Sequence, residues 1–275
     1  MSQLTKQLFS VENKNVVITG GTGVLGSVMA KGMAEAGAQV IILGRRADAG
    51  DKVVKEIEKA GGKATFFQAD VLNKEELQTV KHKILTAFKT IDILINGAGG
   101  NMPGATIPPD KTFFDLDTKA FQQVVDLNLL GTVLPSQVFG EVMAKNKQGI
   151  IINISSMSAF RPITRVVGYS AAKAAIDNFT QWLAVELAKK VGQGIRVNAI
   201  APGFFITEQN RALLTNTDGT LTARGNAVIN QTPFGRFGEA DELVGTLLWL
   251  CSDASKFVTG VVVPVDGGFN AFCGV

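Results

Sequence analysis

The sequence predicts an α/β fold in which a doubly wound parallel sheet of about seven strands is covered by helices on both faces. Short runs of β-branched residues alternate along the chain with longer stretches of helical periodicity. The short runs are apolar at consecutive positions, which is typical of parallel strands buried on both faces. No Pro-, Ser- or Gly-rich linker divides the chain, so we expect residues 1–275 to form a single domain.

The expected elements follow one another in a regular order. Apolar residues at helical spacing, from Val24 through Met29 to Met33, predict a helix over residues 24–36. Similar periodicity predicts helices within residues 73–88, 117–145, 168–190 and 239–252. Strands are expected at Val16–Thr19, Val40–Leu43, Thr65–Phe67, Ile91–Ile95, Ile150–Ile154, Ile195–Ile200 and Val261–Val265. Because strand and helix alternate, a ligand crevice is expected at the carboxyl ends of the strands.

Two segments interrupt this alternation. Residues 99–115 contain three prolines, and residues 204–232 show no clear strand or helix period. Long irregular segments in a compact α/β domain are usually functional. We therefore expect both segments to act as lids over a substrate.

Composition and charge exclude several classes of protein. Hydrophobic residues make up 46% of the chain and charged residues 19%, which supplies a large core and excludes a disordered protein. The 27 basic and 24 acidic residues are spread through the sequence, so we expect no nucleic-acid partner. The apolar runs are too short for a bilayer, and Met1–Ser10 has no apolar signal-peptide core. We expect a cytoplasmic protein without membrane association.

Cysteine and histidine are too few for a metal centre. Cys251 and Cys273 form no Cys-x-x-Cys pair, which disfavours a disulfide framework and a zinc site. The single histidine, His82, cannot build a histidine-rich metal site or a Ser-His-Asp triad. We expect no bound metal, and any proton chemistry must use other side chains.

A glycine-rich turn joins the first strand to the first helix. Glycines allow a pyrophosphate to approach the backbone, and the N-terminus of the next helix attracts its negative charge. The strand, turn and helix together predict a dinucleotide site in a Rossmann-type fold; a tight turn without a ligand is the alternative. The contact residues are expected to be Gly20, Thr22, Gly23, Val24, Leu25 and Gly26.

Two arginines end the second strand, where a carboxylate would bind the adenosine ribose of NAD. Arg45 and Arg46 offer planar guanidinium groups that suit a 2′-phosphate. The cofactor is therefore expected to be NADP or NAD, with NADP slightly favoured. The alternative is that both arginines are solvated at the start of the next helix and NAD is held by backbone contacts.

The single tyrosine of the chain lies four residues before a lysine. This spacing places Tyr169 and Lys173 on one helix face. A nearby ammonium favours the phenolate and lowers the pKa of the phenol, which makes it a better acid–base group near neutral pH. Ser156, at the end of a predicted strand, could bond the same carbinol oxygen. Taken alone, this common spacing would favour a buried phenol beside a surface lysine.

These motifs jointly point to a known family. They are Thr19–Gly26, Asp70-Val71, Asn96–Gly99, Asn128, Ser156, Tyr169–Lys173 and Pro202-Gly203. In order and spacing they resemble those of the short-chain dehydrogenase/reductases, over essentially the whole chain. Two departures stand out: Val24 occupies the usual place of the middle glycine, which shifts to Gly23, and Gly97 replaces the second asparagine of the usual pair.

The resemblance assigns a role to each group of the reaction. It makes Tyr169 the general acid in the reducing direction and Ser156 the group that positions the substrate carbonyl. It makes Lys173 the group that lowers the pKa of Tyr169 and binds the nicotinamide ribose. Asn128 would support a water-mediated proton relay to Lys173, with a hydrogen bond inside a helix as the alternative.

The resemblance also implies cofactor contacts. They involve Asp70, Val71, Asn96, Gly97, Ala98, Gly99, Tyr169, Lys173, Pro202, Gly203, Ile206 and Thr207. For Asp70 the alternative is a helix N-cap before residues 73–88.

In residues 96–101, 155–162, 202–211 and 263–269 the chain more closely resembles the D-mannonate oxidoreductase (fructuronate reductase) branch of the family. It implies interconversion of D-fructuronate and D-mannonate, a substrate with one carboxylate and several hydroxyls. Arginine is the natural clamp for a carboxylate, although each arginine could equally be solvated or structural. The expected substrate contacts are Asn101, Ser156, Arg161, Arg165, Gln209, Asn210 and Arg211.

Other functions remain open. A reductase of another sugar acid or polyol, such as gluconate, or of a 3-oxoacyl thioester would use the same machinery. A non-enzymatic nucleotide-binding protein is a remote alternative. The apolar helices within 117–145 and 168–190, and the apolar tail 269–275, resemble subunit contacts and imply a homotetramer or homodimer. The alternative for the tail is that it covers its own core.

Overall fold

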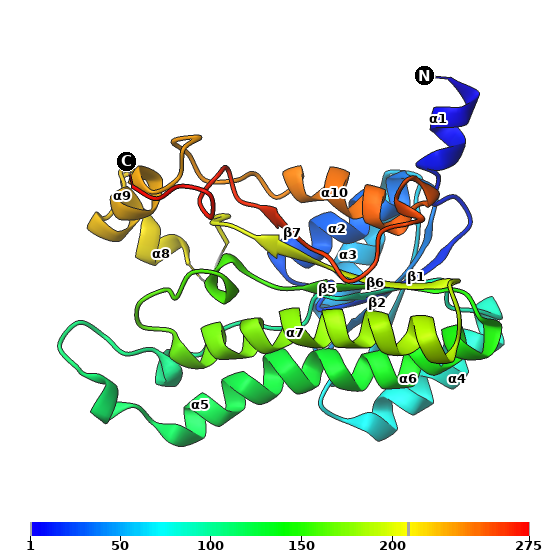
Figure 1. Cartoon of the computed structure of the whole chain (residues 1–275), viewed down its shortest axis with the longest axis horizontal. Coiled ribbons are helices and arrows are strands. Elements are labelled where there is room, and N and C mark those ends of the chain that lie inside the picture. The colour runs from blue at the N-terminus through cyan, green and yellow to red at the C-terminus, as the bar shows by residue number, and fades with distance from the viewer. Residues whose placement is uncertain (1, 208–209, 275) are drawn as a thin grey trace.

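The computed structural model describes residues 2–207 and 210–274. Its centre is a parallel sheet in the order β3-β2-β1-β4-β5-β6-β7, with helices on both faces (Figure 1). The strands are β1 Asn15–Thr19, β2 Gln39–Gly44, β3 Lys63–Gln68, β4 Ile93–Asn96, β5 Gly149–Ile154, β6 Ile195–Pro202 and β7 Val262–Val265. All seven expected strands are confirmed, with small shifts at their ends.

The helices form two layers, one on each face of the sheet. Helices α2 Val24–Glu35, α3 Ala47–Lys59 and α10 Glu242–Cys251 cover one face. Helices α4 Lys74–Phe88, α6 Gly131–Asn146 and α7 Val167–Lys190 cover the other, where α5 Thr118–Val125 continues into α6. The consecutive apolar residues of the strands therefore contact helices on both sides, as expected for parallel strands. A short helix, α1 Gln3–Leu8, precedes the sheet.

The structure differs from the sequence expectations in three helical regions. Helix α3 was expected only without bounds, as the helix after Arg46, because it buries a narrow stripe of Gly50, Val53 and Ile57. The stretch expected as one helix over 117–145 is interrupted by a π-helical turn at Asp126–Leu130. The 204–232 segment is not irregular throughout, since it contains α8 Arg211–Leu214 and α9 Ala223–Asn230.

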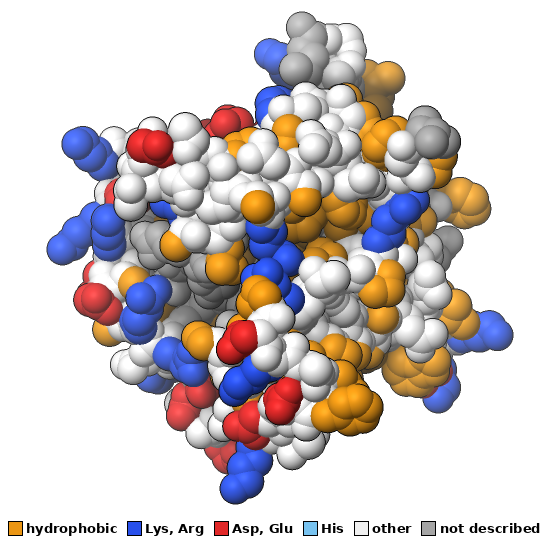
Figure 2. Space-filling view, turned by 90° about the vertical axis from the view of Figure 1, so that its left-hand side faces the viewer, with side chains coloured by type: hydrophobic (Ala, Val, Ile, Leu, Met, Phe, Trp, Pro, Cys, Tyr) orange, Lys and Arg blue, Asp and Glu red, His pale blue; other side chains and the backbone are white. Residues whose placement is uncertain are grey.

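The carboxyl ends of the central strands are level with one another. Thr19 of β1 pairs with Leu43 of β2 and Asn96 of β4, and Asn96 pairs with Asn153 of β5. Helices α8 and α9 lie near this edge of the sheet, on the left of Figure 1. Viewed from that side, Lys and Arg side chains gather in the middle of the face, among apolar side chains (Figure 2). None of the helices in the described ranges is long and apolar enough to cross a membrane.

Candidate active site

The glycine-rich turn after β1 is held tightly against the loop after β4. Gly20 has a φ of +68°, and a Cβ there would lie 2.6 Å from the carbonyl oxygen of Gly97. A Cβ on Gly26 would lie 2.2 Å from the carbonyl oxygen of Gly20. A Cβ on Gly23, by contrast, would meet only ordinary contact at 3.5 Å. Packing within the chain therefore requires glycine at two of these positions but not at Gly23.

The N-terminus of α2 opens at this turn without a side-chain cap. Gly23 is its N-cap residue, and no acidic residue lies in the first turn of the helix. Helix N-termini carry unpaired N–H groups and a partial positive charge, which bind anions well. The uncapped helix and the open space beside Gly23 together fit a phosphate group.

The loop after β4 connects this turn to the tyrosine and lysine. Gly97 donates its N–H to the Thr19 carbonyl at 3.1 Å, and Ala98 donates to the Thr19 hydroxyl at 3.2 Å. A Cβ on Gly99 would lie 2.6 Å from Asn128 Oδ1 and 3.4 Å from Lys173 Nζ. The glycine turn, this loop and Lys173 thus form one continuous edge.

The structure brings together the four residues of the expected reaction centre, which we call the proton-transfer set: Asn128, Ser156, Tyr169 and Lys173. Ser156 follows β5, and its hydroxyl bonds the phenol of Tyr169. Lys173 lies one helical turn after Tyr169 on α7, with Nζ 5.5 Å from the ring centroid. Its ammonium donates to the Ile154 carbonyl at 2.6 Å. The end of β5 and the start of α7 therefore fix the geometry.

Burial controls the ionisation of this set. It raises the pKa of Tyr169 above its ordinary value, and the bond with Ser156 only partly offsets the rise. That Lys173 lowers this pKa stays a prediction; its ammonium lies 5.5 Å from the ring centroid and is held by the Ile154 carbonyl. Burial also lowers the pKa of Lys173 to about 8, against the opposing charge of Asp177. The phenol therefore keeps its proton at neutral pH, as a proton donor must.

Asn128 lies in the π-helical turn and is fully buried. Its side chain donates to the Gly100 carbonyl at 2.7 Å and the Val124 carbonyl at 2.8 Å, and accepts from Gly100 N–H at 3.1 Å. π-Helical turns recur at functional sites. The amide therefore bonds inside its helix, as the alternative expected, and also fixes the loop that faces Lys173, while the proton relay stays a prediction.

The side chain of Asn96 has an internal role. It donates to Ser136 at 2.9 Å and to Asn153 at 2.8 Å, and Asn153 in turn donates to Thr180 at 2.9 Å. This buried polar chain ties β4 and β5 to α6 and α7. The amide donor group of Asn96 is therefore fully used within the protein.

Asp70 does not cap the next helix. Asn73 does so, by accepting from the Glu76 N–H at 3.2 Å, while Asp70 accepts from the Leu72 N–H at 2.9 Å within a turn. The N-cap alternative for Asp70 is therefore wrong. Val71 is buried beside Gly131, at the beginning of α6.

Arg45 and Arg46 are exposed between β2 and α3. Neither guanidinium bonds another residue among those that the structure describes, although Arg45 accepts a bond from Gln68 at its carbonyl oxygen. Both remain available to a ligand.

The segment after β6 carries a compact turn. Pro202 ends the strand, and Gly203 lies so close to Asp266 that a Cβ would approach its Cα to 2.6 Å. Thr207 N–H donates to Asn210 Oδ1 at 2.7 Å, and Asn210 Nδ2 donates to the Phe205 carbonyl at 2.8 Å. The Asn210 amide is thus engaged in the turn. Ile206 is partly buried there, and Gln209 lies outside the described residues.

The expected substrate arginines have different surroundings. Arg161 donates from Nε and Nη2 to the Asn270 carbonyl, at 3.0 and 2.6 Å, and so anchors the C-terminal segment. Arg211 is exposed at the start of α8. Arg165 precedes α7 with a φ of +77°. Asn101 donates to Thr106 at 2.7 Å, while its Oδ1 is buried and accepts no bond from the described residues.

Sequence reasoning missed two charged residues near this edge. Asp177 lies one turn after Lys173 on α7, and burial raises the pKa of its carboxyl to about 6. Its four-residue spacing from Lys173 was a usable signal. Arg224, on α9, bonds Thr164 at 3.2 Å. No sequence pattern links residues 164 and 224, so this contact could not have been predicted.

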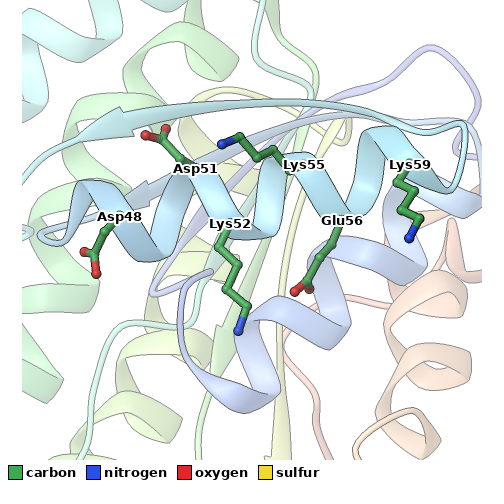
Figure 3. Close-up of a pocket in the computed structure, with 6 residues that line it drawn as sticks. All are labelled: Asp48, Asp51, Lys52, Lys55, Glu56 and Lys59. Carbon is green, nitrogen blue, oxygen red and sulfur yellow. The ribbon is translucent and has the colours of Figure 1, made fainter.

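A hollow of ≈ 450 Å³ lies along α3, away from the glycine turn and Tyr169 (Figure 3). Its lining side chains all come from that helix, and they are three Lys, two Asp and one Glu. Glu56 is further paired with Lys31 of α2 at 2.7 Å. Balanced, exposed charges of this kind are typical of a solvated helix face, so this hollow offers little to a ligand.

Comparisons with known proteins agree with this geometry. The family model described as enoyl-(acyl carrier protein) reductase matches residues 23–270. An uncharacterized oxidoreductase, UxuB, of Bacillus subtilis is 50% identical over 97% of this chain and 98% of its own length. A solved structure from Haemophilus influenza, provisionally named D-mannonate oxidoreductase and holding NAD, is 50% identical with a TM-score of 0.91, over 98% of this chain and 100% of that one. The solved structure of a gluconate 5-dehydrogenase of Burkholderia cenocepacia, in complex with NADP and tartrate, is 29% identical with a TM-score of 0.86. The match covers 98% of this chain and 99% of that one.

Proposed function

Because this chain belongs to the short-chain dehydrogenase/reductase family, we propose that it interconverts a keto sugar acid and the corresponding hydroxy acid with a nicotinamide cofactor. The observation that carries the proposal is the continuous edge from the glycine turn to Tyr169 and Lys173. A protein that only binds nucleotides needs the turn but has no use for a buried phenol, hydroxyl and ammonium placed together. Function is thus argued from the site rather than from the fold.

The residues present fit a dinucleotide. The uncapped N-terminus of α2 and the open space beside Gly23 would hold the pyrophosphate, and Lys173 would bind the nicotinamide ribose. Asp70, Val71, Gly99, Ile206 and Thr207 would line the rest of the cofactor. When bound, the cofactor supplies or accepts the hydride.

The free guanidinium groups of Arg45 and Arg46 support NADP, because a 2′-phosphate would give them a partner. The 50% identical structure that holds NAD supports the other choice. NADH and NADPH measured in parallel decide between them. If NADP is the cofactor, Arg45→Ala should raise the KM for NADPH about tenfold and leave that for NADH nearly unchanged.

The protein's own groups manage the proton. In the reducing direction, the Tyr169 phenol donates its proton to the carbonyl oxygen as that oxygen gains charge, while the Ser156 hydroxyl bonds the same oxygen. Lys173 remains fixed by the Ile154 carbonyl and keeps a positive charge beside the phenol. Asn128 keeps the Gly99–Gly100 loop in place. The reverse reaction uses the same groups in the opposite order.

D-Fructuronate and D-mannonate are the substrate pair that we favour. The names of two similar structures refer to the sugar acids mannonate and gluconate, and the free Oδ1 of Asn101 can accept a bond from a hydroxyl. Another keto sugar acid, a polyol or a 3-oxoacyl thioester would use the same proton-transfer set. A cytoplasmic location remains a prediction.

The test is oxidation of reduced cofactor by purified protein with D-fructuronate, D-tagaturonate, 5-keto-D-gluconate and an acetoacetyl thioester as separate substrates. Rapid oxidation with D-fructuronate alone is the expected result. Activity with another keto acid alone would change the assigned substrate and leave the proposed reaction mechanism unchanged. Activity with the thioester alone, or no activity with any of the four, would overturn the proposal.

We also propose that α7 packs against a second copy of the chain. Trp182 and Val185 are 58% and 56% exposed on this helix, which is unusual for large apolar side chains. A dimer or tetramer in light scattering, converted to a smaller species by Trp182→Glu, is the expected result. A monomeric wild-type protein would contradict the proposal.

A further inference from the structure

Two arginine side chains from distant parts of the sequence lie close together near the carboxyl edge of the sheet. Arg165 stands just before α7, and Arg224 is the second residue of α9. Arg224 Nη1 donates to the hydroxyl of Thr164, the neighbour of Arg165, at 3.2 Å. The charge of Arg165, together with burial, lowers the pKa of Arg224. Arg224 is thus held at the residue that precedes Arg165 in the chain, both arginines are partly buried, and their like charges repel each other.

Among the residues that the structure describes, no acidic side chain compensates this repulsion. Neither guanidinium forms an ion pair with any carboxylate in residues 2–207 or 210–274. Arg236, by contrast, is paired with Glu242 at 2.6 Å. Partly buried like charges without a partner are unfavourable unless an anion is bound between them.

The backbone at Arg165 is also held in an unusual conformation. Its φ of +77° is in the left-handed region, which residues with a Cβ seldom adopt. Its carbonyl accepts a bond from Ile107 N–H at 3.0 Å, so the 99–115 segment contributes to holding it. Strain of this kind clusters at ligand sites. The Arg165–Arg224 pair thus lies where the 99–115 segment, the start of α7 and the 204–232 segment meet.

The Arg165–Arg224 pair lies near the reaction centre, because one of its members shortly precedes Tyr169 in the sequence. Arg165 precedes Tyr169 by four residues, and Tyr169 lies in the first turn of α7. That helix has no side-chain cap, so its N-terminus adds a partial positive charge near the pair. The other expected arginine of this stretch, Arg161, is already engaged by the Asn270 carbonyl.

We propose that Arg165 and Arg224 together bind the carboxylate of the substrate and so select sugar acids over neutral sugars. This inference rests on the proposed function, which makes the substrate a carboxylic acid. Two guanidinium groups can share the two oxygens of one carboxylate, which removes their mutual repulsion and fixes the orientation of the chain of hydroxyls. Arg224 thereby becomes a specificity residue contributed by the 204–232 segment.

The test compares wild type with Arg165→Ala, Arg224→Ala and Arg224→Lys in steady-state reduction of D-fructuronate. A charge-assisted hydrogen bond implies a rise in KM of about 10- to 100-fold for each alanine variant, with kcat nearly unchanged. Arg224→Lys should give a smaller rise in KM, because lysine keeps the positive charge but cannot make the two parallel hydrogen bonds of a guanidinium. The KM of the double alanine variant should rise by a smaller factor than the product of the two single effects, since both residues share one carboxylate.

The controls separate this role from a structural one. Lys59→Ala removes a positive charge from the exposed end of α3 and should leave KM unchanged. The melting temperature and the cofactor Kd should be the same in every variant. An unchanged KM in Arg165→Ala and Arg224→Ala would overturn the proposal, and so would an equal rise in the KM for the cofactor.

A binding experiment keeps the clamp distinct from the proposed function. D-Mannonate and the uncharged D-mannitol are titrated calorimetrically into the enzyme loaded with oxidised cofactor. The clamp predicts that wild type prefers mannonate and that Arg224→Ala removes this preference. If wild type binds mannonate in this way but reduces no keto acid, the proposed function fails and the clamp stands. If wild type reduces fructuronate but the variant keeps the preference, the clamp fails and the function stands.

Discussion

The proton-transfer set and the two segments around it are built by different means. Asn128, Ser156 and Lys173 are at most 9% exposed, and each is held by bonds to neighbouring backbone or by the end of a strand. In the 99–115 and 204–232 segments, large apolar side chains face solvent: Phe114 is 93% exposed and Leu213 is 51% exposed. The proton-transfer set is thus held by the scaffold, while the two segments that we propose to select the substrate leave large apolar side chains exposed.

Among the variants that test this comparison, Tyr169→Phe is expected to lower activity the most. Loss of a general acid typically costs 10²- to 10⁴-fold, so we expect kcat to fall by about 10³-fold or more. The cofactor Kd should change little, because the ring and its contact with Lys173 remain. Stopped-flow turnover and fluorescence titration of reduced cofactor measure the two quantities. Retained turnover would remove Tyr169 from the mechanism.

Gly23→Ala tests whether the glycine turn serves a ligand rather than the fold. A Cβ there meets only ordinary contact at 3.5 Å, so the melting temperature should stay within a few degrees. The methyl group would instead occupy the space beside the N-terminus of α2, and we expect the cofactor Kd to rise about tenfold or more.

Gly245→Ala provides the matched control, because its Cβ would have no neighbour within 4 Å. It should leave the cofactor Kd unchanged. Equal Kd values for the two variants would show that the space beside Gly23 is not used by the cofactor.

Asp177→Asn tests the electrostatics beneath Lys173. Burial raises the pKa of Asp177 from 3.8 to about 6, so the folded state binds more protons than the unfolded state between these values. Wild-type stability should therefore fall as pH rises through this window, by on the order of 1–2 kcal/mol after allowance for solvent screening. The asparagine variant should lack this fall. The variant should also lower the pKa of Lys173 below about 8, because the Asp177 charge raises it.

Urea unfolding at pH 4 and pH 7, together with a pH–rate profile, checks both effects. Asp51→Asn, on the exposed face of α3, is the control and should follow wild type (Figure 3). A parallel pH dependence for wild type and Asp177→Asn would show that this carboxyl is not perturbed.

The smallest effect is expected at Phe114→Ser in the 99–115 segment. A side chain that is 93% exposed has little burial to lose, so the free energy of unfolding should change by less than about 0.5 kcal/mol. Chemical denaturation measures it. A loss of several kcal/mol would mean that the segment is packed in solution and would weaken the comparison.

Features that depend on neighbouring residues in the sequence were predicted correctly. The strands followed from consecutive β-branched residues, and the pairing of Tyr169 with Lys173 followed from helical spacing. The π-helical turn at Asn128 escaped prediction because it extends a helical pattern without a change in composition. Contacts between distant segments were equally hidden: neither the bond from Arg161 to Asn270 nor the approach of Arg224 to Arg165 has a local signature.

The raised pKa of Tyr169 has a similar origin. The sequence showed an ammonium one helical turn away, but not that the Ile154 carbonyl would hold it or that the phenol would be buried. Charge proximity could be predicted from spacing, whereas desolvation depends on the whole fold.

The most direct test of the account is an isotope transfer experiment. Reduced cofactor that carries deuterium at the transferable position of the nicotinamide is incubated with the enzyme and D-fructuronate, and the product is analysed by mass spectrometry. The account predicts D-mannonate with one deuterium on the new carbinol carbon, and none of this product from Tyr169→Phe. Product without deuterium, or no reduction at all of D-fructuronate and the other keto sugar acids, would contradict it.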